Sequence, residues 1–460
     1  MSERLLEAVI PRLTDRVHQV MAQQGVPGVS LGVVRDQVLL WSGGFGYADV
    51  ASSRPMDADT IFGVASITKT FTATAIVQLR DRGRLTLDDP VTRYIPEVKK
   101  VRCRFGSIKD LTLRRLMTHR TGLVGEASGG HWWNMSFPSR RQILAMLPSI
   151  EVVFESDTTF KYNNLAFVLL GEVVARVSRR SYADYVRRQI LEPLGMESSS
   201  FDVGNPRSAT GYMPERYQDT PAIAPDPSTN GYIAAAGLRS CVTDLAKWIS
   251  FQFHAGSEEQ SGTQVLSGKS LSEMHRIGFV EPNWLAGYAL TWMATRIGEN
   301  IYIHHGGSVP GFLSMVAFNK PHRLGVVVLT NKQGNVASGT IAFDALEMLV
   351  GEVKKEVVPP SPTPAPVNVK PLLGRYVGMP AFGVIFHVEW RGGALQLVTP
   401  SDPFTMPMPP VSLAATDQPN VFVPQEGRLA GEPLTFQFDD VGQVTGVQLR
   451  AFGGHLKKTD

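Results

Sequence analysis

Six prolines between residues 359 and 371 divide the chain into a long part and a short part. They are Pro359, Pro360, Pro362, Pro364, Pro366 and Pro371. Proline has no backbone N–H to donate, so a stretch this rich in proline cannot form a helix or a sheet and should be extended. We therefore predict a large domain over residues 1–355, a proline-rich linker over 356–371, and a small domain over 372–460.

Apolar periodicity in the large domain predicts a mixed α+β fold. Residues from Leu5 to Met21 are spaced as on one face of a helix, and this helix should end at Gly25. Strand-like apolar runs lie at 29–34, 37–42, 314–318 and 324–330. Helical patterns lie at 66–82, 164–178, 181–191, 242–253 and about 338–350. Strands at both ends with helices between them predict one sheet built from both ends, covered by helices that form a cleft.

The small domain has a strand pattern instead. Every second position is apolar at Val384, Phe386, Val388 and Trp390, and again at Leu434, Phe436 and Phe438. Between the first run and Leu395, the pair Gly392-Gly393 fits a two-residue turn. We therefore predict a small antiparallel all-β domain, either a barrel or a sandwich.

The charge balance argues against nucleic acid as a partner. The 460 residues include 45 Lys+Arg and 42 Asp+Glu, a formal net charge of +3, and the basic residues are dispersed. The two cysteines, Cys103 and Cys241, are too few and too far apart for a disulfide framework or for a zinc or redox site of the CxxC type.

The N-terminal sequence lacks the apolar stretch of a signal peptide. The most apolar helical run, 165–175, contains Glu172 and is shorter than the ~20 residues that a membrane span needs. We therefore expect a cytoplasmic protein without a membrane partner.

The first candidate catalytic motif is Ser66-Ile67-Thr68-Lys69, at the start of a predicted helix. Residues three apart lie on one face of a helix, so Ser66 and Lys69 should be neighbours. The hydroxyl would lie at the positive end of the helix dipole, and a buried, deprotonated lysine could accept its proton. The motif therefore fits a serine nucleophile, although Ser-x-x-Lys is also common as a helix start with a solvated lysine.

The second motif, Tyr162-Asn163-Asn164, directly precedes the predicted helix at 164–178. A tyrosine phenol near a lysine can relay a proton, and the amide of Asn164 can hold a substrate carbonyl. The alternative is structural: the tyrosine packs at an interface and the asparagines cap the helix.

The third motif is His304-His305-Gly306-Gly307-Ser308, which follows a strand-like run. Its glycines let the backbone approach a ligand closely, and the N–H of Ser308 could donate to an oxyanion. Adjacent residues on a strand point to opposite faces, so a metal site shared by His304 and His305 is not expected.

In this order and spacing, the motifs resemble those of the serine β-lactamase and penicillin-binding-protein superfamily, which combines Ser-x-x-Lys with a polar second motif and a Lys-Thr-Gly third motif. The Tyr-x-Asn form is similar to that of class C β-lactamase-related esterases, D-aminopeptidases and peptidases. Further similarities lie in segments 116–123 (LMTHRTGL), 191–196 (LEPLGM) and 237–240 (GLRS). The resemblance covers residues 8–350.

The resemblance implies an α+β fold in which an antiparallel sheet from both ends of the domain is flanked by helices, with a helical subdomain. It also implies a serine hydrolase that needs neither a metal nor an organic cofactor. Ser66 would form an acyl-enzyme, and Lys69 and Tyr162 would share the proton transfers, either of them as general base. The backbone N–H groups of Ser66 and Ser308 would form the oxyanion hole. Substrate would be bound by Asn164, His305, Gly306 and Gly307.

One residue departs from the pattern of the β-lactamases. His305 stands where they have a lysine that helps to bind the substrate carboxylate, and a histidine is mostly neutral near pH 7. We therefore expect small amides, short peptides (including those with D-amino acids) or esters as substrates. A β-lactamase, a carboxylesterase, and a non-hydrolytic sensor that binds an acyl ligand in the same cleft are the alternatives.

The small domain resembles the lipocalin-like β-barrel that some peptidases of this group carry. There the barrel can cover the active-site cleft or mediate assembly, so a homo-oligomer is one expectation. An independent module that binds a ligand or has a structural role is an equal alternative.

Overall fold

The computed structural model describes residues 2–129, 131–215, 221–255, 265–356, 363–378, 384–398, 409–427, 429–449 and 454–459. The chain divides into two compact units, Met1–Lys355 and Glu356–Asp460, and each is described by itself.

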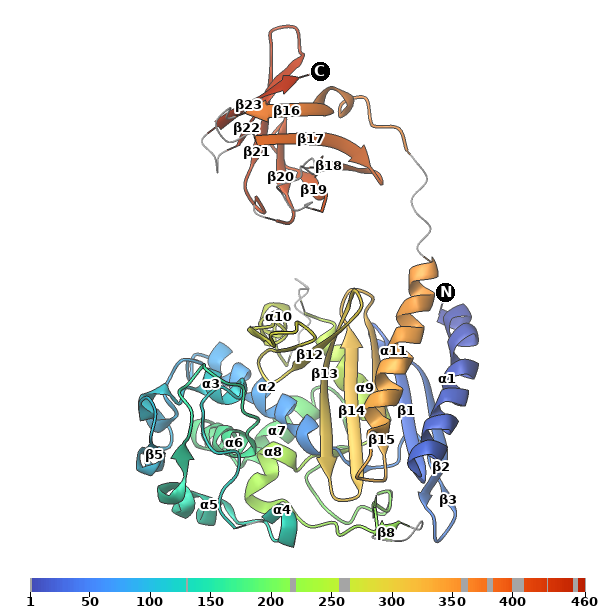
Figure 1. Cartoon of the computed structure of the whole chain (residues 1–460), viewed down its shortest axis with the longest axis vertical. Helices are drawn as coiled ribbons and strands as arrows, with labels where there is room; N and C mark the ends of the chain where they lie inside the picture. Colours follow the sequence, from blue (N-terminus) through green and yellow to red (C-terminus); the bar gives the residue numbers. More distant parts are fainter. Residues whose placement is uncertain are drawn as a thin grey trace. The chain divides into compact units, whose positions relative to one another are not determined.

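A nine-stranded antiparallel sheet forms the centre of the first unit (Figure 1). Its strands, in spatial order, are β10 (Phe279–Val280), β11 (Ala286–Tyr288), β12 (Met293–Ile297), β13 (Asn300–Val309), β14 (Phe312–Asn319), β15 (Leu324–Thr330), β1 (Gly28–Arg35), β2 (Val38–Asp49) and β3 (Arg54–Pro55). The pairing of β1 with β15 aligns Val29 with Thr330 and so joins the two ends of the unit. The prediction of one sheet built from both ends is confirmed.

Helices cover both faces of this sheet. On one face, α1 (Ser2–Gln24) and α11 (Ala337–Glu356) pack against alternate strand residues such as Val326 and Val328. The residues between them, Val327 and Leu329, belong to the core on the other face, which includes α9 (Val242–Gln252). This alternation explains why the central strands have continuous apolar runs, since both of their faces are buried.

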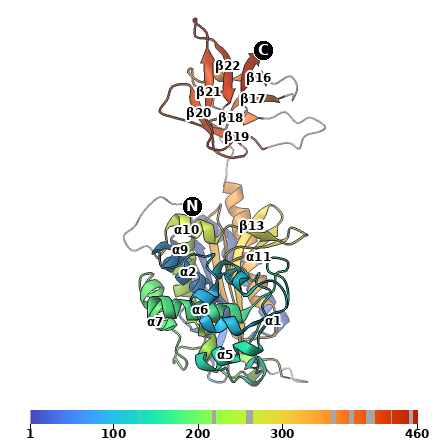
Figure 2. The same ribbon diagram turned by 90° about the vertical axis from the view of Figure 1, so that its left-hand side faces the viewer.

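The remaining helices form a second layer beside the sheet, which Figure 2 shows from its helical side. The buried helix α2 (Thr68–Asp81) lies at its centre and packs against α6 (Asn164–Ser178) and α8 (Ile233–Ala236). Every residue of α2 from Thr68 to Leu79 is buried, which is typical of a helix surrounded by protein. The side chain of Lys69 is therefore buried in the core.

The shorter elements of the unit connect these layers. The helices are α3 (Leu113–Met117), α4 (His131–Asn134), α5 (Arg140–Met146), α7 (Tyr182–Val186) and α10 (Gly268–Met274). The two-residue strands pair as β4 (Phe62–Gly63) with β9 (Arg239–Ser240), β5 (Arg102–Cys103) with β6 (Glu151–Val152), and β7 (Tyr212–Met213) with β8 (Ala222–Ile223). Within the described ranges, no helix has both the length and the apolar character needed to cross a bilayer.

Two predicted helices differ from the structure in their detail. The helix expected from Ser66 begins with a 3₁₀ turn, Ala65–Ile67, and continues as α2 from Thr68. The helix expected over 181–191 is α7 only as far as Val186, and a π-helical turn, Arg187–Leu191, follows it. The spacing of apolar residues does not distinguish an α-helix from a 3₁₀ or π turn, because these differ only in the spacing of their backbone hydrogen bonds.

The second unit contains a closed barrel of eight antiparallel strands. They are β16 (Gly374–Gly378), β17 (Val384–Arg391), β18 (Ala394–Val398), β19 (Val411–Ala415), β20 (Val421–Pro424), β21 (Leu434–Phe438), β22 (Val444–Leu449) and β23 (Gly454–Thr459). The pairing of β16 with β23 closes the barrel, which decides between the two predicted architectures. Gly392 and Gly393 form the predicted turn, with φ of +59° and +78°.

The end of the predicted linker belongs to the barrel. The described part of the proline-rich segment begins at residue 363, where the carbonyl of Thr363 accepts a hydrogen bond from the indole N–H of Trp390 at 3.0 Å. A 3₁₀ turn over Lys370–Leu372 follows, and Leu372 is buried in the barrel core. The extended linker predicted as far as Pro371 is therefore wrong over its last residues, because burial of Leu372 holds this turn in place. Residues 357–362 lie outside the described residues.

Candidate active site

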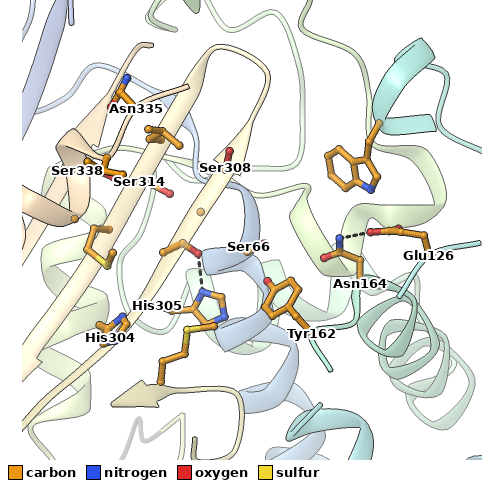
Figure 3. A pocket seen from close by; sticks show the side chains of 18 residues that line it. Ser66, Glu126, Tyr162, Asn164, His304, His305, Ser308, Ser314, Asn335 and Ser338 are labelled. Atoms are coloured by element: carbon orange, nitrogen blue, oxygen red, sulfur yellow. Dashed lines mark hydrogen bonds between the residues drawn. The ribbon is translucent and has the colours of Figure 1, made fainter. Parts of the chain in front are cut away.

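A cleft of about 570 Å³ lies between β13 and the helical layer. Figure 3 shows Ser308 and Ser314 on the strand side, and Tyr162, Asn164 and Glu126 on the helical side. The seven predicted site residues that line it are Ser66, Tyr162, Asn164, His305, Gly306, Gly307 and Ser308. The eighth, Lys69, lies behind Ser66 and is fully buried. The structure thus brings together residues that are separated by more than 200 positions in the sequence.

The turn that carries Ser66 is strained and is held by two side-chain hydrogen bonds. Ala65, the residue before it, has φ of +50°, a left-handed conformation that is costly for a residue with a Cβ. The hydroxyl of Thr68 donates to the carbonyl of Ala65 at 2.6 Å, and the hydroxyl of Ser314 donates to the carbonyl of Val64 at 2.9 Å. These bonds hold the strained turn against the sheet and present Ser66 to the cleft.

Lys69 is a buried lysine whose direct partners are uncharged. Its ammonium group donates to Ser66 Oγ at 2.9 Å and to the carbonyl of Ala235 at 2.9 Å. The rings of Tyr162 and Phe167 lie 5.0 and 5.6 Å from Nζ. Burial lowers the pKa of Lys69 to about 7, although the charge of Glu126 opposes this shift. Near neutral pH, a large fraction of the lysine is therefore neutral and able to accept a proton from Ser66.

The second motif divides its roles between neighbouring residues. Asn163 is the N-cap of α6: its Oδ1 accepts from the N–H of Ala166 at 2.7 Å, and its Nδ2 donates to the carbonyl of Leu123 at 2.8 Å. The structural interpretation therefore holds for Asn163. Tyr162 and Asn164 line the cleft, and Figure 3 shows the hydroxyl of Tyr162 directed toward Ser66. Burial raises the pKa of Tyr162, while a hydrogen bond with Ser66 lowers it, so the phenol keeps its proton near neutral pH.

His119 is a buried neighbour of this site to which sequence reasoning gave no role of its own. Its ring stacks on Tyr162 with a centroid distance of 4.5 Å and lies 5.2 Å from Phe167. The backbone N–H of Asn163 donates to Nδ1 at 3.0 Å, so the hydrogen of the neutral ring is on Nε2. Burial, and then the charge of Lys69, hold the pKa of His119 well below its usual range. A neutral imidazole therefore backs Tyr162. Its place in segment 116–123 is the signal that could have found it.

On the opposite wall, Gly307 of β13 lets the strand approach the serine turn. A Cβ at Gly307 would lie 2.2 Å from the carbonyl oxygen of Val64 and 2.4 Å from Ser314 Oγ. A side chain at this position would therefore push the strand away from Ser66. The close approach places the backbone of Ser308 beside the turn.

The two histidines of β13 face opposite sides of the sheet. His304 bonds Thr295 through Nε2 at 2.9 Å and packs against Phe343 of α11. His305 is buried on the side of Lys69, where burial and the lysine lower its pKa to about 3. Its Nδ1 lies 2.7 Å from the carbonyl of Gly306, so Nδ1 carries the hydrogen. Both rings are thus neutral at pH 7, since burial lowers the pKa of His304 to about 4.

Several residues of the cleft lie outside the three motifs. They are Glu126, Trp132, Met293, Leu313, Ser314, Met315, Asn335, Val336, Ser338 and Gly339. Trp132 lines the cleft and also packs edge-on against Phe137, with the ring centroids 4.8 Å apart. Glu126 carried no sequence signal, because its neighbours in the cleft come from other segments. Among the described residues, no group of three or more His, Cys, Asp or Glu side chains has the arrangement of a metal site.

An antiparallel sheet, a helical layer, and a serine-lysine pair between them define the serine β-lactamase and penicillin-binding-protein class of fold. The model of the family named Beta-lactamase matches residues 13–347. The chain therefore belongs to the Beta-lactamase family.

Two known proteins are similar to a large part of this chain. Protein flp of Staphylococcus aureus (strain N315) is 29% identical over 321 residues, which cover 69% of this chain and 62% of flp. The chain thus spans less than two thirds of the length of that relative. The D-alanyl-D-alanine-carboxypeptidase/endopeptidase AmpH of Escherichia coli (strain K12) is 27% identical over 282 residues, 60% of this chain and 71% of AmpH.

A solved structure matches this chain over both of its units. The octameric penicillin-binding protein homologue from Pyrococcus abyssi is 26% identical, with a TM-score of 0.65, and the match covers 98% of this chain and all of that one.

Proposed function

We propose that the protein is a serine hydrolase that forms an acyl-enzyme at Ser66 and hydrolyses small amide, peptide or ester substrates. The observation that carries this proposal is the 2.9 Å contact between Ser66 Oγ and Nζ of a fully buried lysine whose pKa is about 7. A lysine in this state is a base matched to neutral pH, and it lies within reach of the nucleophile.

In the acylation step, neutral Lys69 takes the hydroxyl proton of Ser66 as Oγ attacks the substrate carbonyl. A tetrahedral intermediate forms, and its oxyanion accepts from the backbone N–H groups of Ser66 and Ser308. Tyr162, whose raised pKa keeps it protonated, passes its proton to the leaving group and is reprotonated from Lys69. Of the two candidates for the general base, the pKa values favour Lys69.

In the second step, neutral Lys69 takes a proton from water as the water oxygen attacks the acyl carbon. The bond from this carbon to Ser66 Oγ then breaks, and the proton passes from Lys69 to Oγ. Asn164, His305, Gly306 and Gly307 would bind the substrate along the walls of the cleft. The cleft volume of about 570 Å³ suits a small acyl group or a short peptide.

The substrate proposal draws on both the relatives and the site. AmpH is named as a D-alanyl-D-alanine carboxypeptidase/endopeptidase, which supports a peptide bond as the target. The neutral His305, where β-lactamases have a lysine, disfavours substrates that need a cation for their carboxylate. We therefore place an amidase or peptidase before a carboxylesterase, and both before a β-lactamase or a non-hydrolytic sensor.

A labelling experiment tests the proposal. The protein is treated with a fluorophosphonate, its intact mass is measured, and the modified peptide is located. We expect one adduct at Ser66 in the wild type and none in Ser66→Ala, which exchanges one small residue for another. Hydrolysis of nitrophenyl esters and of D- and L-aminoacyl nitroanilides then gives the bond type. An adduct at Ser66 without turnover of any substrate in the panel would point to a sensor. Labelling of another residue would show that Ser66 is not the nucleophile.

We also propose that residues 1–355 and 372–460 are separate domains, in a cytoplasmic protein that self-associates as the Pyrococcus homologue does. The described residues that line the cleft all lie between Ser66 and Gly339. Truncation after Val358 should therefore leave Ser66 reactive toward a fluorophosphonate, with a changed oligomeric state or substrate size preference. Labelling, activity on short and long substrates, and sedimentation are measured beside the full chain. A folded truncated protein that no longer reacts would show that the barrel completes the site.

A further inference from the structure

The cleft has an unbalanced charge. Among the described residues that line it, Glu126 is the one with an Asp, Glu, Lys or Arg side chain. His304 and His305 also line the cleft, and both are neutral at pH 7. Lys69 lies behind the lining and is neutral in the form that acts as base. A substrate in this cleft therefore meets a carboxylate without a lysine or arginine in the lining to offset it.

Three side chains hold the Glu126 carboxylate at the cleft surface. Nδ2 of Asn164 donates to Oε1, Nε2 of His131 lies 3.1 Å from Oε2, and Tyr232 is a further hydrogen-bond partner. The ring of His131 is buried and its Nδ1 has no partner among the described residues, so its bond to Glu126 is the one that fixes the ring. The side chain of Glu126 nevertheless remains 36% exposed, and its charge is available to a ligand.

The backbone on both sides of Glu126 is also anchored. The carbonyl of Gly125 accepts from the N–H of Leu165 at 3.0 Å, and the N–H of Ala127 donates to the hydroxyl of Tyr232 at 3.0 Å. Tyr232 is fully buried. The position of the carboxylate is thus built into the helical layer.

Glu126 in turn decides which end of the Asn164 amide faces the substrate. A carboxylate only accepts hydrogen bonds, so the NH₂ group of Asn164 must point toward it. Figure 3 shows this nitrogen directed at Glu126 and the carbonyl oxygen of Asn164 on the side of Tyr162. Asn164 therefore offers an acceptor to the cleft, beside a second acceptor that is negatively charged. Trp132, which also lines the cleft, adds an aromatic surface that favours cations.

We propose that Glu126 and Asn164 bind a protonated amine on the acyl side of the substrate. The protein then selects acyl groups with a free amine, such as an aminoacyl group, over those whose amine is acylated or carries a carboxylate. This inference rests on the proposed acyl-enzyme at Ser66 and adds the substrate class to it. Two acceptors and no cation at this wall are complementary to an ammonium group and repel a carboxylate.

The test uses reversible boronic acids, which report acyl-side recognition independently of the bond that the protein cleaves. The boron atom accepts an electron pair from Ser66 Oγ and forms an O–B bond, while the hydroxyl proton goes to Lys69 and no group leaves. Three compounds share one carbon skeleton: 1-aminoethylboronic acid, its N-acetyl derivative and its N-succinyl derivative, each as both enantiomers. Their inhibition constants are measured at pH 7 on the full chain, by protection of Ser66 from a fluorophosphonate.

We expect the free amine of one enantiomer to bind roughly 10- to 100-fold more tightly than the N-acetyl compound, with the N-succinyl compound weakest, as for one hydrogen-bonded ion pair. Glu126→Gln, which keeps an acceptor for Asn164, should remove this preference. Glu155→Gln is the matched control, since Glu155 is exposed and lies outside the cleft lining. It should leave the preference unchanged.

Each other outcome has a definite meaning. Equal binding of the amine and N-acetyl compounds, a preference that survives in Glu126→Gln, or failure of all three compounds to protect a serine that the fluorophosphonate labels would overturn the amine site. A uniform loss of affinity for all three in Glu126→Gln would also overturn it, because that is the effect of a purely structural brace. Absence of fluorophosphonate labelling at Ser66 would instead refute the proposed function on which the site rests.

Discussion

Two buried ionisable side chains on neighbouring helices have opposite surroundings. Lys69 on α2 is fully buried, and the groups that it contacts are a hydroxyl, a carbonyl and two aromatic rings. Glu172 on α6 is 6% exposed, and the guanidinium groups of Arg140 and Arg176 both donate to its carboxylate. A second carboxylate, Glu97, binds Arg176 through two hydrogen bonds of 2.9 and 3.0 Å.

This difference separates a structural charge from a reactive one. The carboxylate of Glu172 is paired with two guanidinium groups, and the one from Arg140 joins α6 to α5. Lys69 has no direct counter-charge among its contacts with the described residues, and burial moves its pKa into the range where it exchanges protons near neutral pH. The four predictions that follow test this contrast.

The largest effect is expected from Lys69→Met, which keeps the length of the side chain and removes its basic nitrogen. Turnover should fall by ~10²–10⁴ because Ser66 loses the group that takes its proton. The measurement is kcat/KM on the best ester or amide of the panel, with circular dichroism to show that the fold is kept. A folded variant with near-wild-type turnover would mean that another group is the base.

Tyr162→Phe should lower turnover by a similar or smaller factor, within ~10²–10⁴, since it removes the hydroxyl that protonates the leaving group. The ring and its stacking on His119 remain, which makes the variant a test of the proton alone. Comparing a nitrophenyl ester with an amide sharpens the result, because a good leaving group needs less protonation. If both substrates react as in the wild type, the relay through Tyr162 has to be given up.

The free energy of unfolding should depend on Glu172 rather than on Lys69, which is the reverse of the order expected for turnover. Glu172→Gln is expected to lower the free energy of unfolding by roughly 1–3 kcal/mol, because two arginines lose a charged acceptor, while turnover stays within a factor of about three. Lys69→Met should not lower it at pH 7. The pKa of Lys69 is about 7 in the folded state and 10.5 for a solvated lysine, so folding at pH 7 requires the unfavourable loss or burial of its charge. This free-energy cost of folding disappears as the pH rises toward 10.5. Chemical denaturation at pH 7 and 9 measures both, and a destabilised Lys69→Met would contradict the contrast.

The smallest effect concerns the acid side of the pH profile. Deprotonation of Lys69 predicts that kcat/KM rises with pH through about 7. The charge of Glu126 raises the pKa of Lys69, so Glu126→Gln should move this rise to lower pH by a fraction of a unit. The profile is measured with a neutral ester, so that recognition of an amine does not contribute. If the midpoint of the kcat/KM profile is unchanged or raised in Glu126→Gln, the carboxylate does not raise the pKa of Lys69.

Much of the scaffold follows from local pattern. The apolar runs predicted strands at both ends of the first unit, and the register of β1 with β15 shows them as neighbours. The turn at Gly392 and Gly393 was predictable because few other residues adopt positive φ twice in succession. The three motifs contained residues on both walls of the cleft, although much of its lining lies outside them. These features depend on near neighbours in the chain.

The chemistry of the site depended on contacts between distant segments. Ser-x-x-Lys does not say whether its lysine is solvated. Here distant segments that include Ala235 and Phe167 enclose Lys69, and this burial lowers its pKa. The motif around Tyr162 did not say which asparagine is the cap; the fold gave that role to Asn163 and turned Asn164 toward Glu126.

The amino-acid sequence by itself determined the strands, the principal helices and the residues of the motifs, because periodicity and turn chemistry act over a few positions. Only the tertiary structure decided which of these residues are reactive and what charge the cleft presents. Proton affinity depends on the dielectric and on the charges within a few ångströms, and here those come from segments up to about 170 residues away, such as Ala235 beside Lys69.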